Sequence, residues 1–382
     1  MIGPDLDVPG GVSAVENAIL QYPPPGVQVD FHPTLTRHGA AAALRNQPIR
    51  YFARGVKNLS SFVFLLNSLK KRISNYDLVH IHLSTRASTF RKYFVCKYTR
   101  RENRLHILHN HGGSYREFFA QLSPLLQRKV RGMFLSARGT IVLSEQWLQF
   151  HREMLGTEHY PLWVLSNPVE LPSLEGISAE CTAKLLFLGR IGEHKGADRI
   201  LRAIAKLPDA VRAQVRLCMA GDGAVDEACA LAEQLGLASQ VEIRGWIAGA
   251  EKEAWMRQTN VFILPSRNEG LPMAMLEAMA WGKALIVSPV GGIPEFVTDG
   301  VEGFLVPPDD IDAIADAIRK LAENPDLRVQ MGTAARKRVE PLDIQNYRVR
   351  LGKIYREALG LATSAPSSRW RAQARRERDA SR

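Results

Sequence analysis

The stretch from Val261 to Pro289 limits most strongly how this chain can fold. Val261–Leu264 is a short apolar run that ends at a proline, as buried strands often do. A polar, glycine-bearing loop follows, and Pro272 then suits the first turn of a helix over 273–281. That helix stops at a glycine, and the apolar run 284–288 is typical of a second buried strand. This order of strand, loop, helix and strand predicts an open α/β sheet.

Two carboxylates of this stretch are candidates for a ligand site. Glu269 lies in the loop at the carboxyl end of the first strand, and Glu277 lies about one turn inside the helix. Ligands of open α/β sheets bind at the carboxyl ends of the strands, and the helix start at 271–273 offers free N–H groups and a positive dipole end. We expect a phosphate there, with one acid on each side of a sugar nucleotide. The alternative is a solvated helix acid beside an unrelated loop acid.

The segment E-G-L-P-M-A-M-L-E resembles the E-x7-E motif of the family 4 retaining glycosyltransferases, which have the GT-B fold. Two acids at this spacing are a weak signal alone, but the order of strand, Pro-Ser, helix, glycine and strand around them matches as well. The resemblance implies an α/β protein with two Rossmann-like domains and a cleft between them. It covers nearly the whole chain up to about Gly360, strongly after Lys184 and loosely before it.

The resemblance also implies how the chain is divided. Residues 1–170 form an amino-terminal, acceptor-side domain, and residues 171–343 form the carboxyl-terminal domain that binds the nucleotide sugar. A last helix, 344–360, returns to the first domain. Residues 361–382 form a basic tail with little apolar content, which we expect to be disordered. The segment 170–183, with Pro, Ser and acids but no strong period, is interpreted as the linker.

A second motif follows the first strand of the carboxyl-terminal domain, 184–188. It reads G-R-I-G-E-H-K-G and resembles the family's G-R-x-x-x-x-K-G element. Arg190 offers a planar fork of donors and Lys195 a compact charge, and both suit a diphosphate. Surface ion pairing is the alternative. Two further strands end in glycine turns at Gly221 and Gly245, and in the family these turns border the nucleoside through backbone atoms.

The amino-terminal domain offers two more candidates. Gly10 and Gly11 form a turn between a strand and a helix, where backbone can approach phosphate; in the resembled family this turn faces the donor diphosphate. His111 follows the strand 105–109 and precedes two glycines. It resembles the family's strand-end histidine near the donor sugar and acceptor, and His109 is the runner-up. A plain turn and a structural histidine are the alternatives.

The resemblance assigns roles to these residues. The catalytic set is Glu269, His111, Arg190 and Lys195. The donor-binding set is Gly10, Gly11, Arg190, Lys195, Gly221, Gly245, Glu269, Gly270, Leu271, Pro272, Met273 and Glu277. We expect Glu277 to hold the ribose hydroxyls and Glu269 a sugar hydroxyl. Because the cations and the helix N–H groups would stabilise the leaving diphosphate, neither a metal nor a cofactor is expected.

Composition narrows the partners. The net charge of +11 favours an anionic partner. We expect no nucleic acid, because no nucleic-acid motif is present and the tail and the segment 85–104 account for much of the excess. That segment carries seven basic residues and one acid. We expect it to be helical with its aromatic residues, Phe90, Tyr93, Phe94 and Tyr98, mostly facing the core. Its basic face is either a contact with an anionic membrane surface or a solvated helix face.

The ends and the cysteines bear on localisation. No apolar run in the first half is long enough to span a bilayer, and no signal-peptide pattern opens the chain. The four cysteines lack C-x-x-C spacing, which is typical of reduced thiols in the cytosol. We therefore expect a cytoplasmic protein, with a peripheral position on the inner face of the cell membrane as the refinement. The opening Met1-Ile-Gly-Pro resembles the end of a strand, so we expect either that the natural chain begins upstream or that the first strand is frayed here.

Together these features predict a retaining, metal-independent hexosyltransferase of bacterial surface polysaccharide synthesis. It would move a sugar from a nucleoside diphosphate sugar, UDP-sugar first and GDP-mannose second, to a lipid-linked or glycan acceptor. Two alternatives stay open. One is another enzyme of the same fold, such as a sugar-nucleotide epimerase or a phosphorylase, and the other is a non-enzymatic binder of anionic ligands.

Overall fold

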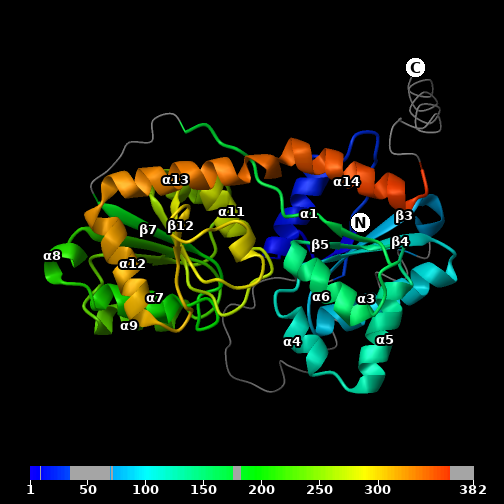
Figure 1. Cartoon of the computed structure of the whole chain (residues 1–382), viewed down its shortest axis with the longest axis horizontal. Helices are drawn as coiled ribbons and strands as arrows, with labels where there is room; N and C mark the ends of the chain where they lie inside the picture. The colour runs from blue at the N-terminus through cyan, green and yellow to red at the C-terminus, as the bar shows by residue number, and fades with distance from the viewer. Residues whose placement is uncertain (9, 35–68, 70–71, 175–181, 362–382) are drawn as a thin grey trace. The chain divides into compact units, whose positions relative to one another are not determined.

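The computed structural model describes residues 1–361 except 9, 35–68, 70–71 and 175–181. The chain divides into two compact units, each built on one six-stranded parallel sheet (Figure 1). Of the described residues, the first unit takes in those of 1–8, 12–165 and 344–361, and the second takes in those of 10–11 and 166–343. The tail beyond 361 and most of the expected linker lie outside the described residues.

The first sheet has the strand order β2-β1-β3-β4-β5-β6. Its strands are β1 (Ile2–Gly3), β2 (His32–Pro33), β3 (Leu78–Leu83), β4 (Leu105–Asn110), β5 (Thr140–Val142) and β6 (Leu162–Val164). The two central strands are long and pair over their whole length, with Leu78 opposite Leu105 and Leu83 opposite Asn110. The edge strand β2 is short because its partner β1 offers only Ile2 and Gly3 for pairing.

Helices pack around this sheet as α1 (Gly11–Gln21), η1 (Ile73–Asn75), α3 (Ala87–Arg101), α4 (Tyr115–Ala120), α5 (Pro124–Leu135), α6 (Glu145–Leu155) and α14 (Ile344–Ala358). The last helix groups with the first unit although it follows the second in sequence. It is anchored there by side chains, since Arg138 Nε donates to the Ala358 carbonyl at 3.1 Å and Arg350 to the Val164 carbonyl at 3.1 Å.

The expectation that the aromatic residues of 85–104 mostly face the core is wrong. Helix α3 turns Thr89, Lys92, Val95, Cys96 and Thr99 inward, whereas Phe90 and Phe94 are 38% and 53% exposed. The lysine can lie inside because its Nζ donates to Thr34 Oγ1 at 2.7 Å. Mostly small and β-branched residues thus form the packing stripe, and Phe90 and Phe94 lie at the surface.

The second sheet has the order β12-β11-β10-β7-β8-β9. Its strands are β7 (Ala183–Leu188), β8 (Val215–Ala220), β9 (Val241–Arg244), β10 (Val261–Leu264), β11 (Ala284–Val287) and β12 (Gly303–Leu305). The helices are α7 (Ala197–Ala205), α8 (Asp209–Arg212), α9 (Val225–Gln234), α10 (Gly249–Gln258), α11 (Met273–Ala280), η2 (Ile293–Glu295), α12 (Ile311–Glu323), α13 (Pro325–Val339) and η3 (Glu340–Leu342). Strand β10 is buried at every position, as its unbroken apolar run predicts.

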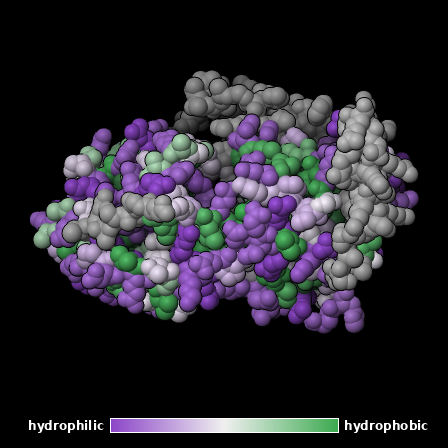
Figure 2. Space-filling model, turned by 90° about the horizontal axis from the view of Figure 1, so that it is seen from above, coloured by the Kyte–Doolittle hydropathy of each residue, from purple (hydrophilic) through white to green (hydrophobic). Residues whose placement is uncertain are grey.

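Among the described residues, no helix is both long enough and apolar enough to cross a membrane. On the face shown in Figure 2, hydrophilic residues predominate and apolar residues form separate patches between them. The described cysteines, Cys96, Cys218 and Cys229, are free thiols.

Candidate functional site

The order in which the chain adds strands to the second sheet reverses between β7 and β10. From the first strand of this unit, β7, the chain builds β8 and β9 on one side and β10, β11 and β12 on the other. Loops that leave the carboxyl ends of the two strands at such a point separate and leave room for a ligand. The loop 189–196 follows β7, and the loop 265–272 follows β10. Both predicted motifs of this unit therefore lie at its switch point.

An ion pair joins these two loops. Lys195 Nζ donates to Glu269 Oε1 at 2.5 Å, and the same oxygen accepts a hydrogen bond from Ser266 Oγ at 2.7 Å. Glu269 is only 7% exposed, whereas Lys195 is 28% exposed. A buried carboxylate is thus held by a cation that still reaches solvent.

Glycines allow these loops to approach other backbone closely. A Cβ placed on Gly196, which has φ +82°, would lie 2.7 Å from the Pro265 carbonyl oxygen. A Cβ on Gly291, which has φ +55°, would lie 1.9 Å from the Glu269 carbonyl oxygen. Gly292 N–H also donates to the Gly270 carbonyl at 2.7 Å. The loop that carries Glu269 therefore has backbone neighbours on two sides, and a side chain at either glycine would displace it.

The turns after β7, β8 and β9 stack on one another. Gly221 leaves no room for a side chain, because a Cβ there would lie 1.7 Å from the Gly189 carbonyl oxygen, and its N–H donates to the Gly245 carbonyl at 3.2 Å. Arg190 projects from this stack with its side chain 74% exposed and 3.6 Å from Asp222. It is a cation open to solvent at the carboxyl end of the sheet.

The amino terminus of α11 carries no side-chain cap among the described residues; the residue at the capping position is Pro272. The loop before it is fixed by Asn167, whose Nδ2 donates to the Leu271 carbonyl at 2.8 Å. Gly10 and Gly11 group with this second unit, and a Cβ on Gly11 would lie 3.5 Å from Met273 Cγ. The helix α11 thus presents uncapped N–H groups, and the neighbouring Gly10 and Gly11 carry no side chains.

Glu277 has a partner that the sequence did not suggest. Lys252 Nζ, on α10, donates to Glu277 Oε1 at 2.7 Å, and the carboxylate remains 23% exposed. A second unpredicted residue is Arg199 on α7, which is 4% exposed and donates to the carbonyls of Glu193 at 2.8 Å and Pro265 at 3.2 Å. Arg199 therefore links the loop after β7 to the loop after β10 by hydrogen bonds to one carbonyl in each. The only sequence signal for it is a charge on the apolar face of an amphipathic helix.

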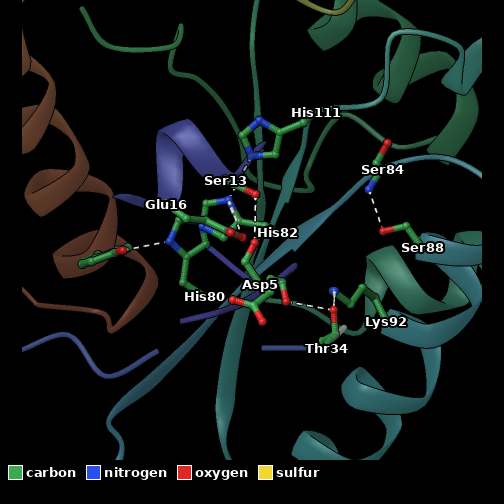
Figure 3. A network of polar contacts seen from close by, with 12 residues as sticks. Asp5, Ser13, Glu16, Thr34, His80, His82, Ser84, Ser88, Lys92 and His111 are labelled. Atoms are coloured by element: carbon green, nitrogen blue, oxygen red, sulfur yellow. Dashed lines mark hydrogen bonds and ion pairs between the residues drawn. The ribbon is translucent and has the colours of Figure 1, made fainter. Parts of the chain in front are cut away.

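His111 belongs to the first unit and follows β4. It is half-buried, and its Nε2 lies 2.9 Å from His82 Nδ1 (Figure 3). Burial lowers the pKa of His111 to about 3, so the ring is neutral at physiological pH. His109 is fully buried, so of the two predicted histidines only His111 reaches the surface of its unit.

Comparison with known proteins finds a family match for most of the second unit. Residues 177–338 match the family described as Glycosyl transferases group 1. The D-inositol 3-phosphate glycosyltransferase of Streptomyces avermitilis is 35% identical over 165 residues, which is 41% of this chain and 35% of the relative. The phosphatidyl-myo-inositol mannosyltransferase of Mycolicibacterium smegmatis is 31% identical over 232 residues, 58% of each chain. This chain therefore spans between about a third and three fifths of the length of these curated relatives.

The fold is also found in solved structures. HepE from Anabaena, in complex with UDP and glucose, superposes with a TM-score of 0.71 at 17% identity, covering 93% of this chain and 99% of that chain. The two parallel α/β sheets and the matched residues confirm the resemblance carried by the E-x7-E and G-R-x-x-x-x-K-G motifs. Residues 177–338 therefore match the group 1 glycosyltransferases, the family 4 type, and the chain has the fold of solved GT-B proteins.

Proposed function

We propose that this protein transfers a sugar from a nucleoside diphosphate sugar to a lipid-linked or glycan acceptor, with retention of configuration and without a metal ion at the donor. The observation that carries the proposal is the Lys195–Glu269 pair at the switch point of the second sheet. It brings a cation and a carboxylate together beside the uncapped start of α11. A diphosphate and a sugar need these two kinds of partner.

The proposed chemistry uses the residues of this site in distinct roles. The bond between the anomeric carbon and the diphosphate breaks, and negative charge grows on the leaving oxygens. Arg190, Lys195 and the first N–H groups of α11 would stabilise that charge. The acceptor oxygen attacks from the same face, and its proton passes to the leaving phosphate. Glu269 would orient a sugar hydroxyl.

Two further residues complete the proposed set. Glu277, with its carboxylate partly exposed beside Lys252, would accept hydrogen bonds from the ribose hydroxyls. His111 would contact the sugar or a reacting hydroxyl, as a neutral ring that can donate or accept one hydrogen bond. Neither role requires a change of protonation during the reaction.

For the donor we propose a UDP-sugar first and GDP-mannose second. A protein of this fold has been solved with UDP and glucose, which supports the first choice. A relative named as a mannosyltransferase supports the second. For the acceptor, both curated relatives bear names of inositol compounds, one a phosphate and one a lipid. A polyol carried on a lipid or phosphate is consistent with a role in surface glycan synthesis.

A nucleotide thermal-shift panel tests the donor assignment. UDP at one hundred times its Kd should stabilise the native state by about 2.7 kcal/mol and raise Tm, and GDP should do so less. Glu277→Gln should weaken the binding of the preferred nucleotide roughly tenfold to a hundredfold, because a charged acceptor for two hydroxyls is lost. Glu253→Gln is the matched control, since this acid of α10 has a 58% exposed side chain and pairs with Arg257. Equal losses of nucleotide affinity in both variants, or no rise of Tm with any nucleotide, would contradict the proposed donor site.

Incubation with the donor alone separates the alternatives. An epimerase would convert the donor into its epimer without an acceptor, whereas a transferase would only hydrolyse the donor slowly to free sugar. A non-enzymatic binder would do neither and would hold nucleotides unchanged. Retention is checked by the anomeric configuration of the product when an acceptor is supplied.

We also propose that the first unit binds an anionic membrane surface through α3. The α3 surface consists of Phe90, Phe94, Lys97, Arg100 and Arg101, all of them exposed. Phe90, Phe94, Lys97 and Arg101 recur at spacings of three or four residues and therefore share one side of the helix. Beside them, Lys97 and Arg100 line a cavity of about 240 Å³ together with Lys129 of α5. Exposed aromatic rings next to cations are the composition of interfacial helices.

A further inference from the structure

The buried rings of His80, His82 and His109 stand in the first unit where strands normally place aliphatic side chains, and Figure 3 shows His80 and His82 with His111 beside them. His80 and His82 lie two residues apart on β3, His109 lies on β4, and His111 follows the end of β4. Residues two apart in a strand point to the same face. His82 stands directly opposite His109 in the register. The ring centroids are 4.2 Å apart for His80 and His82 and 5.0 Å apart for His82 and His109.

Three of these rings present nitrogen atoms that have no hydrogen-bond partner among the described residues. His80 uses Nδ1 toward the Tyr355 hydroxyl at 2.8 Å, and its Nε2 is buried and unpartnered. His82 uses Nδ1 toward His111 Nε2 at 2.9 Å, and its Nε2 is also unpartnered. Both ring nitrogens of His109 are in this state. Since buried polar atoms are almost always paired, three such rings in contact indicate a missing ligand.

A carboxyl group lies beside them. Glu16, on α1, is fully buried, and its Oε1 lies 3.9 Å from His82 Nδ1. Both of its oxygens lack a hydrogen-bond partner in the part of the chain that the structure describes. Gly3 makes room for it, because a Cβ at that position would lie 1.4 Å from Glu16 Oε1. The carboxyl group is thus directed at the imidazoles by a gap in the neighbouring strand.

We propose that His80, His82 and His109 form a binding site for one divalent transition-metal ion of the zinc class, with Glu16 as the neighbouring carboxyl group. One ring nitrogen from each histidine lies within 4.8 Å of the other two. Three nitrogens that bind zinc tetrahedrally are about 3.3 Å apart, so an adjustment of roughly 1 Å would close the site. Imidazole ligands select zinc, copper or nickel over calcium and magnesium.

The surroundings suit a metal in three other respects. Burial lowers the pKa of all three histidines well below the usual value, so each ring is neutral, as a metal ligand must be. Tyr355 and His111 hold the second nitrogens of His80 and His82, which is how metal-binding imidazoles are normally oriented. A cavity of about 310 Å³, lined in part by His32, His80 and Tyr355, offers access for an ion.

Such an ion would be structural. It would fasten β3 to β4 and, through Tyr355, to α14, all within the first unit. The donor diphosphate has its own cations in the second unit, so this proposal does not depend on the proposed transfer reaction. It differs from the expectation that the chain binds no metal.

Metal analysis of the full chain without an affinity tag tests the proposal. We expect about one equivalent of zinc after purification, and visible absorption bands of tetrahedral cobalt after exchange with Co²⁺. Chelation should lower Tm of the wild type. His82→Asn and His109→Asn should each lose the cobalt spectrum and the response of Tm to chelator.

His106→Asn is the matched control. His106 is equally buried on β4, but it lies three residues from His109 and so points to the opposite face. This variant should keep the metal. If His82→Asn does not fold, direct titration of the metal-free wild type with Co²⁺ still decides. A wild type that takes up neither zinc nor cobalt and shows no change of Tm would overturn the proposal, and so would a His106 variant that loses the metal as completely as the His82 variant.

Discussion

Lys195 and Glu269, 74 residues apart in the chain, meet with Nζ 2.5 Å from Oε1. Both residues were predicted for the site, but for different partners, the diphosphate and the sugar. In the structure each satisfies the other, and Ser266 supplies a second donor to the same oxygen. Under the proposed function, the cation is positioned before the donor binds, and its end remains partly exposed.

Replacing Lys195 should damage both stability and donor binding. In Lys195→Met the buried Glu269 carboxylate would keep the Ser266 hydroxyl as its hydrogen-bond partner among the described side chains, and we expect a loss of about 1–2 kcal/mol in the free energy of unfolding. Donor affinity should fall roughly tenfold to a hundredfold, because a charge-assisted hydrogen bond is lost. Denaturant unfolding and nucleotide titration measure the two effects.

Lys206→Met provides the comparison. Lys206 and Asp312 also lie 2.5 Å apart, but their side chains are 54% and 80% exposed. Exposed pairs contribute little, so this variant should change stability by less than about 1 kcal/mol and leave donor binding intact. If both lysine variants lost the same stability and donor affinity, burial of Glu269 would not set the Lys195–Glu269 pair apart from an exposed ion pair.

Gly291 should tolerate no side chain. Gly291→Ala would place a Cβ 1.9 Å from the Glu269 carbonyl oxygen at a position with φ +55°. The loop must move, so we expect a loss of donor binding of at least tenfold along with destabilisation. Gly300→Ala carries the same kind of strain, with φ +80°, but no atom lies within 4 Å of its Cβ. It should cost only about 1 kcal/mol and should not affect the donor, which nucleotide titration of the two variants would check.

How far the sequence could predict this protein differs between its parts. Strand β10 begins and ends at the predicted residues, because it is an unbroken apolar run closed by a proline. Helix α11 was equally clear. The helices α9 and α10 were not predicted, because charged and small residues interrupt their apolar spacing. Local pattern determines an element when burial is uniform along it.

Contacts between distant residues were harder to foresee. Pairing of Lys195 with Glu269 depends on β7 and β10 being neighbours, which is a matter of strand order. The inward position of Lys92 depends on Thr34, 58 residues earlier in the chain. The histidine cluster depends on the register that sets His82 opposite His109. Each of these is a property of the assembled sheet, so no window of the sequence contains it.

Lys283 should make the stability depend on pH. It is 1% exposed and donates to the Thr259 carbonyl at 2.5 Å, and burial lowers its pKa to about 8 from an ordinary value near 10.5. Between these two values the unfolded chain binds more protons than the native state, so the free energy of unfolding rises with pH across this window. Below pH 8 the charged lysine destabilises the fold.

Lys283→Met should remove this dependence. The variant should be more stable than the wild type at pH 7, by on the order of 1–3 kcal/mol, and the difference should shrink between pH 8 and 10.5. Urea unfolding at several pH values gives both curves. A constant difference across the window would mean that Lys283 titrates normally in the native state.

The α3 surface should bind vesicles that contain anionic lipid, and high salt should release it. Each basic residue near an anionic leaflet contributes about 1 kcal/mol, so Arg100→Ser with Arg101→Ser should weaken binding roughly thirtyfold. Phe94→Ser should weaken it further and without salt dependence, because an aromatic ring inserts by burying apolar surface. The charge-matched control is Lys337→Ser with Lys353→Ser, since both lysines are exposed on helices α13 and α14. Vesicle co-sedimentation measures all three variants. If the control variant lost as much affinity as the α3 double variant, the attraction would come from the net charge of the protein alone. That result would contradict a dedicated membrane-binding surface on α3.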